Sequence, residues 1–513
     1  MPFLRQLALL GGPCLFLLCC LLALGLDLPL EMPADSESVV LTAPALLLSG
    51  TTLWMAIWWL SGVVPIYLTA LLPLVIYPLA GVATVKSIGP AYGHYLVWLL
   101  FAGFVLAAAI ERWQLHRRIA LSIILFTGTR PASIILGFMI ATAFLSMWIS
   151  NTATAVMMVP IGMAVASTLK DVQAQEAEVP TTAFPKALML GIAYSASLGG
   201  MSSLIGTPTN PIMVSQVMDN YHLSIGFLEW SLLALPLGII LLLVAWYYLT
   251  QLAFPLSSQG GQAAKKAIEA EYRKLGPVST AEYRVSIIFG ITATLWICRR
   301  LLQTAVQAIS GPDNPPIVDI NDTSIGLLAV LAFFLVPSGI EDAKRPGRQS
   351  RLLSWENVES IPWGVLLLIG GGLAIAASFD TTGLGAYFGE LLSQLSSWPF
   401  LLFLLLLVAG VNFLTELTSN MATVSILMPV LMALAAATGW HPFPLMAGAT
   451  LAAGCAFMLP IATPPNAIVF GTGYIDIPDM ARVGFWMNII SIILITLLVQ
   501  FVLPLVWTLP DIQ

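Results

Sequence analysis

Residues 150–160 read SNTATAVMMVP, and residues 419–429 read SNMATVSILMP, so the two stretches match in register at Ser, Asn, Ala, Thr and Pro. A second pair follows in the same order. Residues 206–212 read GTPTNPI and residues 462–468 read ATPPNAI, sharing Thr-Pro-x-Asn and an isoleucine. Two motifs that recur in the same order predict a duplicated structural unit.

The composition indicates that the solvent around this chain is lipid. The sequence is 58% hydrophobic and only 9% charged, with a mean hydropathy of +0.91, whereas a soluble domain carries about 25% charged residues. The five cysteines lie in or beside apolar runs without CxxC spacing, which predicts buried thiols. No basic stretch with interleaved aromatic residues is present to follow a phosphate backbone, so we expect no nucleic-acid partner.

Apolar stretches long enough to cross a bilayer need about 20 residues. Plain stretches of this kind occur near 7–26, 38–60, 63–83, 91–111, 226–252, 282–300, 323–338, 360–379 and 483–508. Four further apolar regions are interrupted at their centres by Gly, Pro, Ser, Thr or Asn; they lie near 131–168, 186–217, 397–437 and 443–472. The first stretch is longer than a signal-peptide core of about 7 to 15 residues and has no clear cleavage site after it, which favours a retained helix.

The distribution of Lys and Arg predicts the topology. If the N-terminus is cytoplasmic and regions 131–168 and 397–437 enter and return on one side, all basic residues except Lys86, Arg299 and Arg300 lie inside. This bias favours about 11 transmembrane helices plus two re-entrant hairpins, in a multi-pass protein of the plasma (inner) membrane. Polar loops are expected at 301–322 and 339–358.

These features together predict an all-α polytopic membrane protein with an internal repeat. Residues 1–37 form an extra first helix and an external loop, and 256–281 form a cytoplasmic linker. The repeats are 38–255 and 282–513. Because the first repeat begins outside and the second inside, the two units are expected to be inverted in the membrane.

The repeated motifs have the chemistry of an ion site. Ser, Asn and Thr at membrane depth cost several kcal/mol each unless they line a cavity or meet a partner. A hairpin tip leaves free N–H groups at one helix start and free C=O groups at a helix end, which attract anions and cations respectively. Pro in Thr-Pro-x-Asn removes a backbone donor and unwinds a helix. We therefore expect two tips to face two broken helices near the bilayer centre.

Two other classes of membrane protein fit less well. A membrane-embedded enzyme would need paired catalytic groups at depth, and the sequence offers no such pair. A cation/proton or oxyanion antiporter of similar repeat design would need a titrating carboxylate in the site. Glu416 is the only candidate for that role, and a supporting structural role is the preferred interpretation.

The segments LSMWISNTATAVMMVPIG, IAYSASLGGMSSLIGTPTN, FLTELTSNMATVSILMPV and CAFMLPIATPPNAIVFGTG resemble those of the divalent anion/sodium symporter family of di- and tricarboxylate transporters. The resemblance extends from about residue 40 to the C-terminus. It implies inverted repeats, a homodimer and an elevator-type movement of a transport domain against a scaffold. It also implies sodium ions as coupling ions, with no organic cofactor.

The resemblance further implies the site residues. The first sodium site would use Ser146, Ser150, Asn151 and the backbone near Gly199, and the second Thr415, Thr418, Asn420 and the backbone near Ala462. The carboxylate substrate would contact Asn151, Thr152, Ser419 and Asn420, with Thr207, Pro208, Thr463 and Pro464 closing the cavity. C4-dicarboxylates such as succinate are favoured, and a sodium-independent exchanger is the alternative. Met421, where many relatives have Thr, removes a hydroxyl from the expected cradle and leaves the choice of carboxylate open.

Overall fold

The computed structural model describes residues 2–30, 41–175, 182–256, 261–311, 317–342, 345–507 and 509. Among these residues, eight helices are long and apolar enough to span a membrane, or nine if the bent pair α17 (Trp363–Thr381) and α18 (Leu384–Leu392) is counted as one span. Further apolar helices of 10 to 17 residues complete the bundle. The expectation of an almost all-helical, polytopic membrane protein is confirmed.

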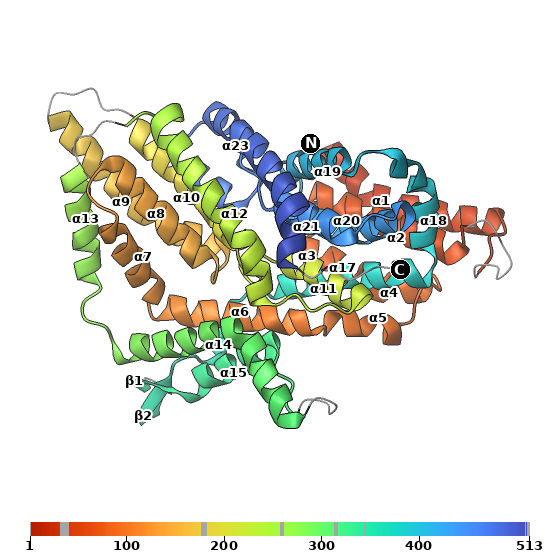
Figure 1. Cartoon of the computed structure of the whole chain (residues 1–513), viewed down its shortest axis with the longest axis horizontal. Coiled ribbons are helices and arrows are strands. Elements are labelled where there is room, and N and C mark those ends of the chain that lie inside the picture. The colour runs from red at the N-terminus through yellow and green to blue at the C-terminus, as the bar shows by residue number, and fades with distance from the viewer. Residues whose placement is uncertain are drawn as a thin grey trace.

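One group of helices, which we call the frame, includes α5 (Val85–Tyr92), α6 (Tyr95–Arg112), α14 (Thr280–Ser310) and α15 (Asp322–Leu335), which lie along one long side of the molecule (Figure 1). In it α6 packs on α15, α15 on α14, and α17 on α5. The N-terminal helix α1 (Pro2–Gly25) packs on α2. The frame consists of α2 (Ala43–Ser61), α3 (Ile66–Thr69), α4 (Leu72–Leu79), α5 (Val85–Tyr92), α6 (Tyr95–Arg112), α14 (Thr280–Ser310), α15 (Asp322–Leu335), α16 (Trp355–Val358) and α17.

The second group, which we call the hairpin bundle, contains all four repeated motifs. At its centre every residue of α21 is buried, as expected for a helix that is apolar on all faces and enclosed by other helices. The hairpin bundle consists of α8 (Pro131–Ser146), α9 (Asn151–Gln175), α10 (Ala183–Met201), α11 (Thr209–Tyr221), α12 (Phe227–Tyr247), α19 (Phe400–Thr415), α20 (Asn420–Thr438), α21 (Pro442–Ala453), α22 (Pro464–Phe470) and α23 (Ile477–Leu497).

The same order of elements occurs in both halves of the chain. In each half a helical hairpin is followed by a broken helix, α10–α11 or α21–α22, and then by a long last helix. Both last helices continue as a short π-helix, at Tyr248–Ala253 after α12 and at Leu498–Val502 after α23. The short helix α24 (Leu503–Val506) follows the second of these segments.

Two short helices connect the frame to the hairpins. The helix α7 (Leu115–Phe126) follows α6 and packs on α8, and α18 follows α17 and packs on α20. They lie toward opposite ends of the long axis (Figure 1). Neither helix was expected from the apolar stretches, because each is shorter than a membrane span.

The structure differs from the sequence-based expectation in one span and two loops, and it places a helix in the expected linker. The stretch 63–83 is not one span but the two short helices α3 and α4, and prolines flank or begin them. Helix α14 continues to Ser310, into the expected loop 301–322. The expected loop 339–358 contains an antiparallel β-hairpin of β1 (Pro337–Asp342) and β2 (Arg345–Arg351). The linker 256–281 contains α13 (Gly261–Lys274), which packs on α9 and α7.

Candidate functional site

The turn between α8 and α9, residues 147–150, is here called tip 1. The last residue of α8, Ser146, is fully buried, and its hydroxyl lies 2.7 Å from Asn151 Oδ1 and 2.7 Å from the Ala196 carbonyl oxygen. Ser150 Oγ accepts a hydrogen bond from the Ala153 amide at 3.3 Å and so caps the start of α9. Tip 1 therefore gathers hydroxyl, amide and backbone oxygens, which are the ligands that hard cations prefer.

The interruption between α10 and α11, residues 202–208, is here called break 1, and glycines allow it to approach tip 1. A Cβ at Gly200 would overlap the Asn151 side-chain amide, and one at Gly199 would overlap the Ala143 backbone. A Cβ at Gly206 would lie 2.7 Å from the Ser146 carbonyl oxygen. Since each position is sterically closed to a larger residue, these glycines hold the backbone of the broken helix against the tip.

The asparagines of the two Thr-Pro-x-Asn motifs tie the broken helices together in the same way. The Asn210 amide donates to the carbonyl oxygens of Gly200 at 3.4 Å and Ser203 at 2.7 Å. The Asn466 amide donates to residues at the same two sequence offsets, Ala456 at 3.2 Å and Leu459 at 3.1 Å. Each asparagine thus satisfies carbonyls that the break releases from the helix.

The turn between α19 and α20, residues 416–419, is here called tip 2. The Thr418 hydroxyl lies 2.8 Å from the Thr423 hydroxyl, and the Thr415 hydroxyl donates to the Asn412 carbonyl oxygen at 3.0 Å. Asn420 Oδ1 is buried and has no hydrogen-bond donor among the described residues. A buried amide oxygen without a donor is costly, so this atom fits a role as a ligand for a cation.

Glu416 binds tip 2 to the interruption between α21 and α22, residues 454–463, here called break 2. Its carboxylate accepts backbone hydrogen bonds from Phe457 at 2.7 Å, Met458 at 2.9 Å and Leu459 at 3.0 Å. The Asn488 side-chain amide donates to it at 2.7 Å. Four donors thus satisfy the buried carboxylate, and no basic side chain of the described residues pairs with it.

Break 2 contacts α10, the helix that leads into break 1, at the centre of the hairpin bundle. Cys455 Sγ lies 3.6 Å from Met201 Sδ, and the Tyr194 hydroxyl donates to the Phe457 carbonyl oxygen at 3.2 Å. Helix α9 packs on α22, and α20 packs on α11, so each hairpin meets the broken helix of the other half. Tip 1, break 1, break 2 and tip 2 therefore form one continuous set of contacts.

The expected site residues occupy different places in this set. Ser146 and Asn151 meet beside Gly200, while Gly199 lies against the Ala143 backbone. Ser150 caps α9, and Thr152 is exposed. In the second half Thr415, Thr418 and Asn420 surround tip 2 beside the half-buried Ser419, and Ala462 is buried in break 2. The Thr463 hydroxyl caps α22 by accepting a hydrogen bond from the backbone N–H of Asn466 at 3.4 Å, and the next residue, Pro464, is exposed. In the first half, the half-buried Thr207 and Pro208 precede α11.

Sequence reasoning left out three features of this region. The roles of Asn210 and Asn466 as ties could have been read from the shared Thr-Pro-x-Asn spacing. The contacts of Glu416 with Asn488 could not, because they join residues far apart in the chain. A buried cluster of charges around Glu229, described below, was also overlooked, because its members stand at the ends of three separate apolar stretches.

Comparison with known proteins identifies relatives over nearly the whole chain. Residues 29–508 match the family described as the sodium:sulfate symporter transmembrane region. Two relatives are named sodium-dependent dicarboxylate transporter SdcS, from Staphylococcus aureus strains bovine RF122 / ET3-1 and USA300. The chain is 39% and 38% identical to them, with 98% of this chain and 92% of each relative covered.

Two solved structures share the fold at low sequence identity. The YdaH transporter of Alcanivorax borkumensis is 14% identical with a TM-score of 0.55, and the alignment covers 99% of both chains. MtrF of Neisseria gonorrhoeae, described with a class of antimetabolite efflux pumps, is 12% identical with a TM-score of 0.56, covering 96% of this chain and 94% of its own. Both are transport proteins, which supports the same fold class here.

Proposed function

This chain belongs to the sodium:sulfate symporter family, and from that membership we propose that it carries small dicarboxylates across the membrane together with sodium ions. The resemblance expected from the sequence motifs is thereby confirmed, and the chain is a transporter rather than an enzyme. The observation that carries the proposal is the continuous set of two tips and two breaks, whose polar groups are enclosed in an apolar bundle.

The charge of these segments supports coupling to sodium. No Lys or Arg occurs within residues 146–152, 199–212, 415–423 or 454–468. A dicarboxylate entering a low-dielectric site needs positive charge, and in this chain bound sodium supplies it. An empty cation site leaves the anion uncompensated, which is a physical reason for the two to move together.

The proposed ligands follow the geometry around each tip. Ser146, Ser150, Asn151 and the Gly199 backbone bind one sodium ion, supported by the oxygens that meet at 2.7 Å around the Ser146 hydroxyl. Thr415, Thr418, Asn420 and the Ala462 backbone bind the other, supported by the unpaired Asn420 Oδ1. The two carboxylates of the substrate contact Asn151 and Thr152 from tip 1 and Ser419 and Asn420 from tip 2, with Thr207, Pro208, Thr463 and Pro464 around them.

The proposed mechanism is an elevator-type movement of the hairpin bundle against the frame. The recurring order of hairpin, broken helix and π-ended last helix supports two repeats, 38–255 and 282–513. The connecting helices α7 and α18 are the segments that such a movement would bend or rotate. We also propose a homodimer in the plasma membrane with a cytoplasmic N-terminus, in keeping with the Lys and Arg bias.

Uptake by purified protein in liposomes tests the function. Labelled succinate should accumulate with an inward sodium gradient and should not accumulate when choline or potassium replaces sodium. Empty liposomes processed in the same way are the control. Equal uptake without sodium, driven by internal unlabelled succinate, would instead support the sodium-independent exchanger. A proton antiporter would instead need proton exchange at Glu416, whose carboxylate accepts hydrogen bonds from four donors.

A further inference from the structure

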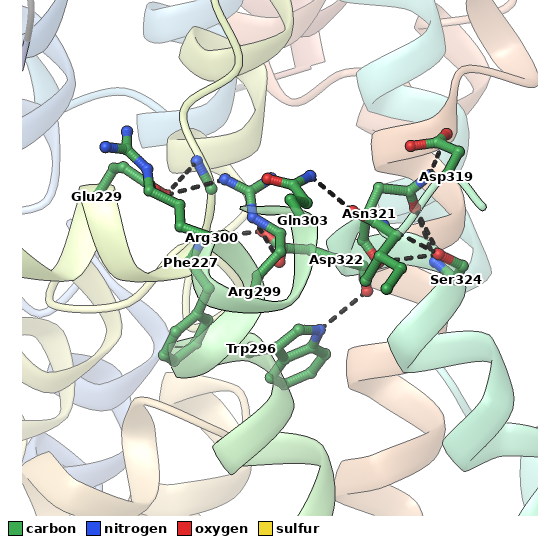
Figure 2. Close-up of polar contacts among 12 residues, drawn as sticks. Phe227, Glu229, Trp296, Arg299, Arg300, Gln303, Asp319, Asn321, Asp322 and Ser324 are labelled. Atoms are coloured by element: carbon green, nitrogen blue, oxygen red, sulfur yellow. Dashed lines mark hydrogen bonds and ion pairs between the residues drawn. The ribbon is translucent and has the colours of Figure 1, made fainter. Parts of the chain in front are cut away.

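Four charged residues meet where the hairpin bundle touches the frame (Figure 2). Glu229 lies in the first turn of α12, Arg299 and Arg300 lie in α14, and Asp322 begins α15. Glu229, Arg299 and Asp322 are 5%, 7% and 5% exposed, whereas the Arg300 side chain is 64% exposed. The cluster is separate from the two tips and the two breaks, and the proposed transport site does not use it.

The contacts of this cluster cross between the two groups of helices. Arg299 Nη2 in the frame lies 3.1 Å from Glu229 Oε2 in the hairpin bundle, and Arg300 Nε pairs with Glu229 Oε1. In the other direction, the Phe227 amide of the hairpin bundle donates to Asp322 Oδ2 at 2.9 Å. Arg299 Nε lies 3.5 Å from Asp322 Oδ1 within the frame. One arginine thus holds an acid from each group.

Aromatic rings extend the same contact to tip 1. Trp148 of tip 1 stacks on Phe227 with ring centroids 5.2 Å apart, and Phe227 stacks on Trp296 of α14 at 5.4 Å. Trp148 also meets the edge of Phe289 of α14 at 4.9 Å. The Trp296 indole donates to the Asp322 carbonyl oxygen at 2.9 Å, which joins the ring stack to the charged cluster. Tip 1, which precedes Asn151, therefore packs on the frame through these rings.

The charge balance of this cluster would change if the two groups of helices separated. With two acids and two arginines the closed cluster is neutral. If the groups separate, Glu229 leaves with the hairpin bundle as a lone negative charge, and the frame keeps Arg299, Arg300 and Asp322 with a net positive charge. A buried ion pair adds little net stability when intact, but breaking one exposes charges that have lost their partners. Intermediate separations, with the charges neither paired nor hydrated, are the least stable.

We infer that Glu229, Arg299, Arg300 and Asp322, with Trp148, Phe227 and Trp296, form a latch that holds the hairpin bundle against the frame in one of its transport conformations. The inference rests on the proposed movement of the hairpin bundle. In this state the latch also fixes tip 1, so the movement that opens it also frees the tip that carries the first sodium site. Weakening the latch should shift the population of conformations away from the state in this structure.

The distance between two spin labels tests the latch without any transport measurement. Labelled cysteines replace Ile309 on α14 and Ile239 on α12, which are 77% and 51% exposed and lie outside the cluster. Cys14, Cys20 and Cys298, the native thiols that are not buried, are changed to serine. Distances are measured in nanodiscs without sodium. Glu229→Gln keeps the size of the side chain and removes its charge, and should lower the share of the latched distance by about threefold or more.

The matched control is Asp479→Asn, the same type of change in an ion pair that lies wholly within the hairpin bundle. Asp479 Oδ2 pairs with Lys186 Nζ at 2.5 Å, joining α23 to α10, and its loss should leave the distances unchanged. Arg300→Gln is a second latch variant with a smaller expected effect, because that side chain is mostly exposed. If Glu229→Gln does not fold, the distances of Arg300→Gln decide whether the latch exists.

A shift with either latch variant and none with the control supports the latch. Distances identical to those of the unmodified chain in every folded latch variant overturn it. Sodium-dependent succinate uptake is measured separately on the unlabelled protein. If the distances overturn the latch but uptake still depends on sodium, the proposed function stands, and if uptake fails as well, both proposals fall.

Discussion

In the first half of the chain, break 1 rests on a tip without formal charge, whereas in the second half break 2 is bound to the carboxylate of Glu416. Both breaks use the same asparagine tie, from Asn210 and Asn466. The residue at the position of Glu416 in tip 1 is Met147, whose carbonyl oxygen accepts from the Ser203 hydroxyl at 2.5 Å. The two halves therefore join tip and break in different ways. In the first, a hydroxyl of the break donates to a carbonyl oxygen of the tip, and in the second, a buried carboxylate of the tip accepts from three backbone N–H groups of the break.

This difference teaches that a repeated motif fixes the shape of a site but not its electrostatics. No basic side chain in the described part of the chain pairs with Glu416, so an ionised Glu416 gives the second half a negative field. A cation at tip 2 would be attracted by that field, while a cation at tip 1 depends on neutral oxygens alone. The two proposed sodium sites are thus expected to be similar in geometry and unequal in charge.

The largest loss of transport is expected from changes to the asparagine that both halves share, Asn151 and Asn420. Asn151→Ala and Asn420→Ala should each reduce succinate uptake by about 100-fold or more, because one amide is proposed to serve both cation and anion and a loss of about 3 kcal/mol corresponds to that factor. Uptake per folded protein in liposomes measures this, with folding checked by size-exclusion chromatography. Near-normal uptake by one variant would remove that asparagine from the site and make the halves functionally different.

The next largest loss of transport is expected at Glu416, where the two halves differ in charge. Glu416→Gln should lower uptake by about 10-fold or more and reduce thermal stability, since three backbone N–H groups and the Asn488 amide lose a charged acceptor. Met147→Leu, at the equivalent position of tip 1, is the control and should retain most of the activity. Melting curves and uptake assays measure the two effects. If both variants behave alike, the charge of tip 2 has no special role.

Adding Asn488→Ala to Glu416→Gln separates packing from charge. If Glu416 acts by holding break 2, the second change should add little, because the contact is already weakened. A fully additive loss would mean that the two side chains act independently. Sodium dependence of uptake, measured for the single Glu416→Gln variant, reports the electrostatic contribution: the sodium concentration needed for half-maximal uptake should rise.

The sequence alone predicted the parts of the fold that depend on local pattern. Apolar length gave most spans, and the repeated Ser-Asn motif marked both hairpin turns, which the structure places at Met147–Ser150 and Glu416–Ser419. Contacts between residues distant in the chain were beyond this reasoning. Glu416 meets Asn488, and Glu229 meets Arg299, only because packed helices bring them together. Short connecting helices such as α7 and α18 were missed because their length gives no membrane-spanning signal.

The smallest effect is expected at Met421, the residue that follows the asparagine at the start of α20. Its counterpart in the first half is the exposed Thr152 of α9, whereas Met421 is half-buried and packs against both apolar clusters of the core. Met421→Thr adds a hydroxyl beside Asn420, and one hydrogen bond of about 1 kcal/mol changes relative affinity about fivefold. Uptake of succinate against citrate should therefore change by about that factor, while the sodium dependence stays the same. Thr152→Met is the reciprocal change. If neither substitution alters the ratio, the residue after the tip asparagine does not contact the carboxylate, and selectivity must come from the breaks.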